Sequence, residues 1–171
     1  MKKLSVLTYL KILVFIALAV VAIKFPNNDF DRVIADLLEI KALEQIAKII
    51  SLIFNDKLLL LIMILLTGFL VWIKELKKAV FIFFSAGFGG FFLATFKYSI
   101  QRGRPLPELH DGFSFPSGHS TFVALFFLAL LFVINKKDIL KVIATFAIIA
   151  IPISRMVLGA HFLSDVIAGL L

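Results

Sequence analysis

Residues 115–134 read FPSGHSTFVALFFLALLFVI, a short polar turn followed by an apolar run. The run over 121–134 predicts a helix in an apolar environment, and the turn marks where that helix begins. Ser117 is a favourable N-cap residue, so the helix should start near it. The N–H groups of its first turn would then be free to bind an anion such as phosphate. Because such a turn is also typical of an ordinary helix start, the rest of the chain must decide.

Two further residues of this turn are suited to binding or catalysis. Gly118 has no side chain, which lets a ligand approach the backbone closely. His119 falls in the first turn of the expected helix, where an imidazole is placed to exchange a proton with a bound ligand. We therefore predict Ser117, Gly118 and His119 as part of a candidate site.

The composition indicates an integral membrane protein. The 171 residues are 61% hydrophobic, and the mean hydropathy is +1.07, well above the values of soluble domains. The net charge of +7 is read as membrane topology, because no basic tract with interleaved aromatic residues predicts a nucleic-acid partner. The absence of cysteine excludes disulfide and thiol chemistry. We see no repeat or linker, so residues 1–171 are predicted to form one domain.

The apolar stretches predict an all-α, polytopic membrane bundle of six transmembrane helices. The first five candidates are residues 4–25, 58–73, 79–96, 121–134 and 139–153. The first half of 4–25 resembles a signal peptide, but its length favours an uncleaved helix. A sixth helix should begin near His161. It reaches Leu171 after about half the length needed to cross a bilayer, so we expect the last helix to be incomplete in this sequence.

Residues 30–54 follow a different pattern. Charged residues interleave with apolar ones at helical spacing, which predicts an amphipathic helix after the first transmembrane helix. Such a helix lies either in the membrane interface or as a packed cap outside the membrane.

The distribution of lysine predicts the orientation of the bundle. Eight lysines fall on one side of the predicted spans, which should be the cytoplasmic side. They are Lys2, Lys3, Lys74, Lys77, Lys78, Lys136, Lys137 and Lys141. The basic residues near 97–119 and 155–161 fall on the opposite side, so they need a reason other than topology.

Three polar clusters converge on that opposite face. The first holds Lys97 and Arg104, the second is the turn at 117–119, and the third joins Arg155 to a histidine and a carboxylate further along. Taken singly, the cations are typical of interfacial anchors. Together they offer several donors and positive charge for phosphoryl oxygens.

The third cluster adds a nucleophile. His161 and Asp165 are four residues apart, so on one helix they share a face and can form a hydrogen bond. An aspartate held against one imidazole nitrogen leaves the other nitrogen as a nucleophile. His119 would then act as a general acid for the leaving group.

A metal site is a competing interpretation of the same residues. His119, His161 and Asp165 are possible ligands, and His110 with Asp111 could join them. The three nearby cations argue against a metal, because they repel it and attract an anion. We therefore predict no metal ion and no cofactor.

These residues resemble the three-part signature of the type 2 phosphatidic acid phosphatase family, which is related to vanadium-dependent haloperoxidases. The matching positions are Lys97, Arg104 and Pro105, then Pro116, Ser117, Gly118 and His119, then Ser154, Arg155, His161 and Asp165. Every signature position is matched. The link over 106–115 is short for the family and implies a compact loop.

The resemblance implies a metal-independent hydrolase with a phosphohistidine intermediate. By position, His161 is the nucleophile, Asp165 orients it, and His119 protonates the leaving group. Lys97, Arg104 and Arg155 would bind phosphate, with Ser117 and Gly118 assisting.

The expected substrate is a lipid phosphate within the membrane, and undecaprenyl pyrophosphate, phosphatidylglycerophosphate and phosphatidic acid are the leading candidates. The expected location is the inner, or plasma, membrane, with the site facing the periplasm or cell exterior. Two alternatives stay open: a lipid phosphotransferase, and a non-catalytic binder or transporter of lipid phosphates.

Overall fold

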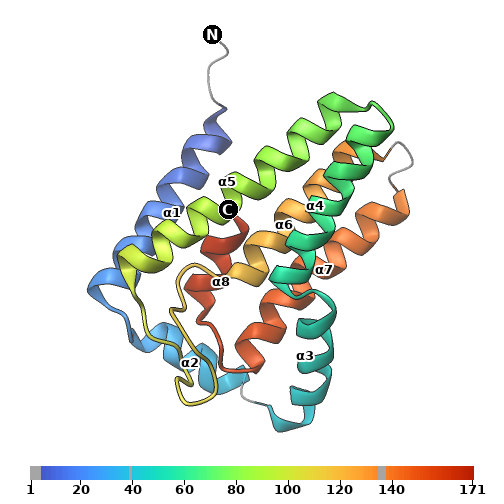
Figure 1. The fold of residues 1–171 in the computed structure, drawn as a ribbon. Helices are drawn as coiled ribbons and strands as arrows, with labels where there is room; N and C mark the ends of the chain where they lie inside the picture. The colour runs from blue at the N-terminus through green and yellow to red at the C-terminus, as the bar shows by residue number, and fades with distance from the viewer. Residues whose placement is uncertain (1–4, 39, 135–137) are drawn as a thin grey trace.

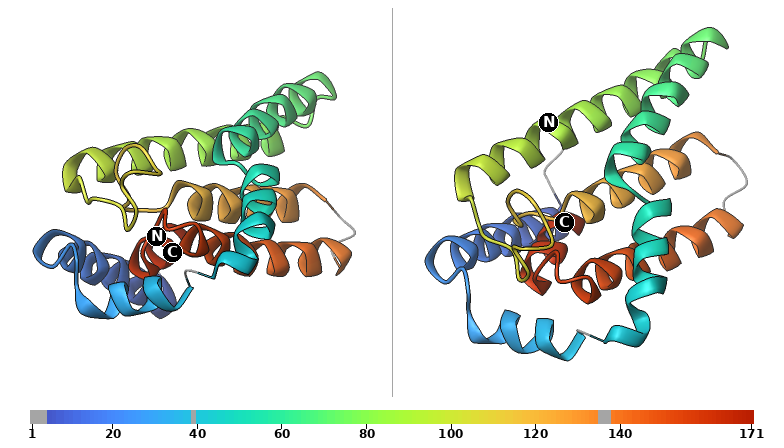
Figure 2. Two further views of the ribbon diagram at one scale, coloured as in Figure 1. Left: turned by 90° about the horizontal axis from the view of Figure 1, so that it is seen from below. Right: turned by 60° about the horizontal axis from the view of Figure 1, so that its bottom comes forward.

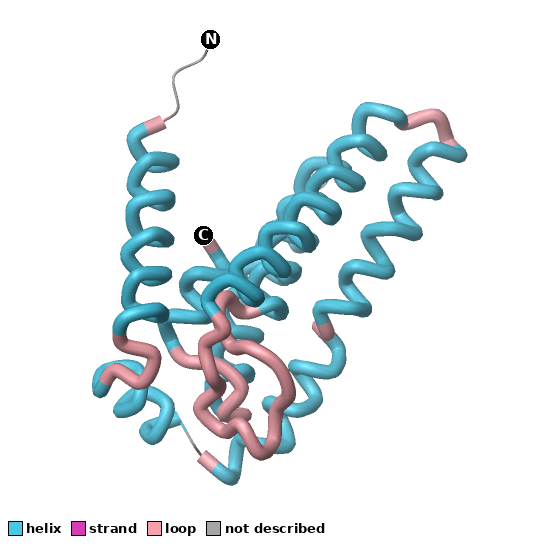
Figure 3. Tube along the Cα trace, turned by 60° about the vertical axis from the view of Figure 1, so that its left-hand side comes forward, coloured by secondary structure: helices cyan, strands magenta, loops and turns pink. Residues whose placement is uncertain are grey.

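A computed structural model describes residues 5–38, 40–134 and 138–171, which form eight α-helices and contain no strand (Figures 1 and 3). The helices are α1 (Val6–Lys24), α2 (Asp29–Leu38), α3 (Lys41–Ile53), α4 (Asp56–Trp72), α5 (Leu76–Ile100), α6 (Gly118–Val133), α7 (Asp138–Val157) and α8 (Leu163–Leu170). This all-helical bundle confirms the predicted fold class.

Several of these helices have the length and the apolar surface of membrane-spanning helices. Four stretches are long and apolar enough to cross a membrane, and α6 is a shorter apolar helix. The four stretches are Val6–Lys24, Lys41–Trp72, Leu76–Ile100 and Asp138–Val157. Large apolar side chains on them are exposed, as Leu13 on α1 and Phe84 on α5 illustrate. Because such contiguous apolar surfaces are rare on soluble proteins, they face lipid, and the chain is a multi-pass membrane protein. The total of six spans stays a prediction.

Helix α6 is the centre of the bundle. It packs against α4, α5, α7 and α8, while α1 lies at the edge against α8 and α5 (Figure 1). Val123, Phe127 and Ala129 of α6 are almost fully buried. The polar first turn of α6 is therefore surrounded by the ends of other helices, so it cannot be a surface feature.

The amphipathic segment differs from the prediction, because residues 30–54 do not form one helix. Helix α2 ends at Leu38, and α3 starts after Ile40, whose backbone is extended. The break lets α2 pack against α7 and α8, whereas α3 follows a separate path along α7 (Figure 2). Contacts with the bundle thus override the continuous helical pattern.

Two apolar helices run further than predicted, which changes where their site residues lie. Helix α5 continues to Ile100 and ends where Gln101 adopts a left-handed conformation, so Lys97 lies on its last turn. Helix α7 continues past Pro152, so Arg155 also lies on a last turn. Proline removes one backbone donor, and helices packed in a membrane bundle tolerate this loss.

The two ends of the bundle differ in character. The α4–α5 turn, which contains Lys74, lies at the end opposite to the loop over residues 101–117 (Figure 1). Lys2, Lys3, Lys136 and Lys137 lie outside the described residues. The predicted lysine side and the predicted site are thus at opposite ends, although the membrane side of each stays a prediction.

Candidate active site

The loop over residues 101–117 brings the three polar clusters together at one end of the bundle (Figures 2 and 3). Its backbone is joined to the α7–α8 connection by a hydrogen bond of 3.0 Å from Leu106 N to Gly159 O. Near its other end, Ser117 N donates to Asp165 O at 3.0 Å. These two bonds fix the loop to the segment that carries the predicted nucleophile.

The turn after α7 depends on Gly159. Its φ of +62° lies in the left-handed region, and a Cβ there would lie 2.3 Å from Leu106 Cδ1. A side chain at this position would therefore be strained and would push the loop away. Glycine lets the chain turn from Arg155 to His161 within five residues, which places the two on one side of the site.

His161 is buried and held in one protonation form. Its Nε2 lies 3.3 Å from Arg104 Nη1. Because a guanidinium only donates, Nε2 must accept, and the single ring proton is then on Nδ1. Burial lowers the pKa of His161 to about 3, despite the opposing effect of Asp165. The imidazole is thus neutral at physiological pH, with its Nε2 lone pair directed at a cation.

The pairing of His161 with Asp165 differs from the prediction of a shared helix face. His161 precedes α8 by two residues, and its Nδ1 lies 3.7 Å from Asp165 Oδ2. That oxygen accepts a hydrogen bond of 2.9 Å from Phe162 N, and His161 Nδ1 has no hydrogen-bond partner among the described residues. The two residues face each other, but the contact is an electrostatic one that a bound ligand could tighten.

Arg104 and Lys97 are fixed by backbone carbonyls of the loop and of the α7–α8 connection. Arg104 donates from Nη1 to Ala160 O at 2.8 Å and from Nε to Asp111 O at 2.9 Å. Lys97 Nζ donates to Phe113 O at 2.6 Å. Both cations therefore have a defined place before any anion arrives, which is the preorganisation that charge stabilisation requires.

His119 forms a second cluster with residues of α3, α4 and α7. Its Nε2 lies 3.4 Å from Ser51 Oγ, which also accepts a hydrogen bond of 2.5 Å from Arg155 Nη1. Its Nδ1 lies 3.9 Å from Asp56 Oδ1. Arg155 Nε is buried and has no partner among the described residues, so it has a donor available for a ligand.

Ser117 and Gly118 form the helix start that the sequence predicts. The Ser117 side chain accepts from Ser120 N at 3.5 Å and from Ser120 Oγ at 3.1 Å, so its cap role is confirmed. The space beside Gly118 is not open, because a Cβ there would lie 2.7 Å from Asp56 Oδ2. The missing side chain makes room for a carboxylate, and contact of Ser117 and Gly118 with phosphate stays a prediction.

All eight predicted site residues thus lie around one end of the bundle. Lys97 is within electrostatic reach of both Arg104 and Arg155. Two histidines, each facing a carboxylate, lie among these three cations. Such an arrangement can bind a phosphate group and offers a nitrogen nucleophile together with a proton donor.

Sequence reasoning missed five polar residues of this region: Asp31, Ser51, Asp56, Arg102 and Ser164. Asp31 and Ser51 lie on segments that read as amphipathic, where polar residues are expected to face water. Arg102 lies between the signature positions Lys97 and Arg104, and the sequence predicts no separate role for it. The available signal was weak, because a loop gives no periodicity from which to assign a face.

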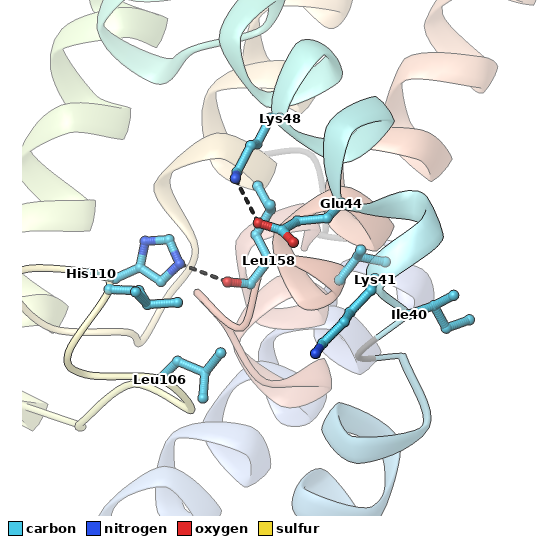
Figure 4. Close-up of a pocket in the computed structure, with 9 residues that line it drawn as sticks. Ile40, Lys41, Glu44, Lys48, Leu106, His110 and Leu158 are labelled. Atoms are coloured by element: carbon cyan, nitrogen blue, oxygen red, sulfur yellow. Dashed lines mark hydrogen bonds and ion pairs between the residues drawn. The ribbon is translucent and has the colours of Figure 1, made fainter.

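A cavity of about 300 Å³ lies beside this region without including the predicted site residues. Leu106, His110 and Leu158 line one wall, and Lys41, Glu44 and Lys48 of α3 line the other (Figure 4). His110 Nε2 lies 2.7 Å from Leu158 O, and Lys48 pairs with Glu44 at 2.6 Å. His110, Lys48 and Glu44 therefore already have polar partners within the protein.

Comparisons with known proteins give a matching family and similar relatives. A family model described as the PAP2 superfamily matches residues 57–171, more than half of the chain. The lipid A 1-phosphatase of Rhizobium johnstonii is 35% identical over 104 residues, which are 53% of this chain and 41% of that protein. The phosphatidylglycerophosphatase B of Bacillus subtilis is 40% identical over 81 residues, which are 41% of this chain and 40% of that protein. The chain thus spans about two fifths of the length of these relatives.

A solved structure shares the fold. It is described as the crystal structure of the first transmembrane PAP2 type phosphatidylglycerolphosphate phosphatase from Bacillus subtilis. The TM-score is 0.81 at 23% identity, and the match covers 95% of this chain and 88% of that chain.

Proposed function

The chain belongs to the PAP2 superfamily, and from that premise we propose that it hydrolyses the phosphate of a membrane lipid without a metal ion. One observation carries the proposal. His161 is buried and neutral, and its Nε2 lone pair is turned toward Arg104 at 3.3 Å. A phosphoryl group bound by the cations of the site would meet this lone pair directly.

In the first step, His161 Nε2 attacks phosphorus and the bond to the lipid oxygen breaks. The electron pair of that bond moves to the oxygen, which takes a proton from His119 and leaves as an alcohol or phosphate. Asp165, 3.7 Å from His161 Nδ1, stabilises the positive ring of the phosphohistidine. Lys97, Arg104 and Arg155 stabilise the charge on the transferring phosphoryl group.

In the second step, a water oxygen attacks phosphorus and gives its proton to His119. The phosphorus–nitrogen bond breaks, its electron pair returns to His161 Nε2, and inorganic phosphate leaves. The same histidine thus serves as acid and then as base, and the enzyme returns to its starting state.

The membrane bundle and the names of the relatives support a lipid phosphate as the substrate class. Those names refer to lipid A 1-phosphate and to phosphatidylglycerophosphate as what those proteins act on. Undecaprenyl pyrophosphate and phosphatidic acid present the same terminal phosphate. All four belong in the substrate panel, because the predicted site residues are assigned to the phosphate and not to the rest of the lipid.

We place the chain in the inner, or plasma, membrane with the site facing the periplasm or cell exterior. We expect a reporter fused after Lys78 to be active in the cytoplasm, because lysine-rich turns are retained there. A fusion after Leu109, in the loop over 101–117, should give the opposite signal. Exchange of the two signals would overturn the assigned orientation.

The experiment that tests the function measures phosphate release by the purified protein in detergent. The panel holds the four lipids, each assayed with a chelator and separately with orthovanadate. We expect release that resists the chelator and is blocked by orthovanadate, which mimics the transferring phosphoryl group. The substrate with the highest kcat/KM would identify the preferred lipid.

The alternatives give different results in the same assay. A phosphotransferase releases little phosphate until an acceptor lipid is added, and then forms a phosphorylated acceptor. A binder or transporter holds the lipid phosphate but releases none under any condition. Release that requires a divalent metal would contradict the metal-independent mechanism.

Asp56 gives a prediction about the general acid. Its carboxylate lies 3.9 Å from His119 Nδ1 and favours the protonated ring that the first step needs. We expect Asp56→Asn to lower kcat about tenfold on a lipid phosphomonoester, whose alkoxide leaves poorly without a proton. The loss should be smaller on p-nitrophenyl phosphate, whose leaving group needs little protonation. Measuring kcat on both substrates checks this.

Asp138→Asn is the matched control for this substitution. Asp138 is fully exposed at the start of α7, where it pairs with Lys141 at 3.6 Å, so the same chemical change should leave kcat unaltered. Equal losses on both substrates in Asp56→Asn would show that Asp56 acts on something other than protonation of the leaving group.

A further inference from the structure

A buried ionic network lies behind the predicted nucleophile and is formed by Asp31, Arg102, Ser164 and Asp165. Arg102 Nη2 donates to Asp31 Oδ2 at 2.8 Å. Arg102 Nη1 donates to Asp165 Oδ1 at 2.7 Å and to Ser164 Oγ at 2.6 Å. Ser164 N donates to Asp31 Oδ1 at 3.0 Å. Asp31 lies on α2, outside the residues that match the family, so the network connects a separate segment to Asp165.

Arg102 has no donor left for a substrate. Its side chain is 0% exposed, and its two remaining bonds run from Nε and Nη2 to Pro26 O at 2.9 and 2.8 Å. A guanidinium has five N–H groups, and all five are thus used within the protein. Arg104 differs, because its Nη1 faces the reactive nitrogen of His161. The two arginines of the same loop therefore have different tasks.

The charge of Asp31 is retained despite its burial. Burial raises the pKa of Asp31, but the hydrogen bonds from Arg102 and Ser164 outweigh it and hold the pKa below its usual value. The guanidinium also lies 4.2 Å from the centre of the Phe162 ring. Buried charges are costly unless each is paired in good geometry, and here each has its partners.

The network determines how Asp165 is oriented. One carboxylate oxygen, Oδ1, is fixed by Arg102, which leaves Oδ2 to accept from Phe162 N and to face His161 Nδ1. Without the donor on Oδ1, the carboxylate could rotate or turn both oxygens toward other donors. His161 Nδ1 would then lose the facing carboxylate, 3.7 Å away, whose charge favours the proton on that nitrogen.

We propose that Arg102 and Asp31 are positioning residues that orient the Asp165 carboxylate, so that one residue of α2, Asp31, supports the predicted site. This inference rests on the proposed function, in which Asp165 in turn orients His161. It assigns no substrate contact to either residue.

The test compares Asp31→Asn and Arg102→Lys with wild type. We expect kcat to fall about 10-fold and 10- to 100-fold respectively, the range typical of second-sphere partners. KM and the inhibition constant of inorganic phosphate should stay within about threefold, because Lys97, Arg104 and Arg155 are untouched. Asp36→Asn and Arg32→Lys, two exposed positions on α2, are the matched controls and should keep wild-type kcat.

A double variant separates positioning from stability. In Asp31→Leu/Arg102→Met, apolar side chains replace one buried ion pair, so one carboxylate (Asp165) is left without its guanidinium, whereas Arg102→Met alone leaves two. We expect its melting temperature to exceed that of Arg102→Met alone while kcat stays low, because Asp165 Oδ1 has still lost its donor. Recovery of kcat together with the melting temperature would overturn the inference. A raised phosphate inhibition constant with unchanged kcat would overturn it as well.

Failure of the positioning role and failure of the proposed phosphatase function give different results. If wild type releases phosphate and the Asp31 and Arg102 variants match it, the positioning role fails and the function stands. If wild type shows no chelator-resistant release from any lipid of the panel, the proposed function itself fails.

Discussion

Replacement of His161 by alanine is expected to lower phosphate release by at least about 10³-fold, because the nucleophile of the proposed first step is removed. The cations predicted to bind phosphate stay in place, since Lys97 and Arg104 are held largely by backbone carbonyls. We therefore expect the affinity for inorganic phosphate to change little. Turnover and phosphate inhibition in detergent, measured on the same preparation, check both parts.

His110→Gln is the matched control for this substitution. His110 lies on the loop over 101–117, and its Nε2 lies 2.7 Å from Leu158 O, a contact that glutamine can also form. Its kcat should stay within about threefold of wild type. Turnover by His161→Ala within about tenfold of wild type would contradict the covalent mechanism, because water attack without a nucleophile is far slower.

The architecture could be predicted from the sequence because lipid leaves few alternatives. Long apolar stretches in a membrane must form helices, so composition and spacing predict both the class and the approximate spans. Helix ends are harder to predict. Lys97 and Arg155 extend α5 and α7 because their charges are satisfied by carbonyl and hydroxyl groups of the site, and hydropathy does not include such contacts.

The residues of the candidate site could also be predicted from the sequence, because they occur as short motifs at helix ends. The ends of α5, α6 and α7 meet at one end of the bundle, so motifs that end one helix or begin the next are brought together. The roles of Arg102 and Asp31 could not be predicted from the sequence in the same way. Their roles depend on contacts over 71 positions of sequence, and neither has a local pattern that separates it from an ordinary surface charge.

The two histidine–carboxylate pairs have different environments, and that difference fits two roles. Asp165 is fully buried behind His161, whereas the Asp56 side chain beside His119 is 27% exposed. Burial keeps His161, the predicted nucleophile, neutral despite Asp165, and a pair near solvent can exchange protons with water between the two proposed steps. Such separation of environments is how one site carries out both acid and base chemistry.

Arg104→Lys is expected to lower kcat/KM by about 10²- to 10³-fold, the range for loss of one preorganised donor to a transition-state charge. The guanidinium reaches Ala160 O, Asp111 O and the His161 Nε2 region at the same time. An ammonium group is a single point charge and cannot span these positions, so it keeps the charge but loses the geometry. We expect kcat to fall more than KM rises, because the lost bonds act mainly on the transferring phosphoryl group. Steady-state kinetics on the preferred lipid provides the measurement.

Arg32→Lys separates this effect from a general sensitivity to the change of side chain. Arg32 is exposed on α2, so its replacement should leave kcat/KM unaltered. A loss of less than about fivefold in Arg104→Lys would mean that charge alone suffices at this position. The simultaneous contacts of the Arg104 guanidinium with the backbone carbonyls and His161 would then have no catalytic role. The neutral imidazole would owe its orientation to Asp165 alone.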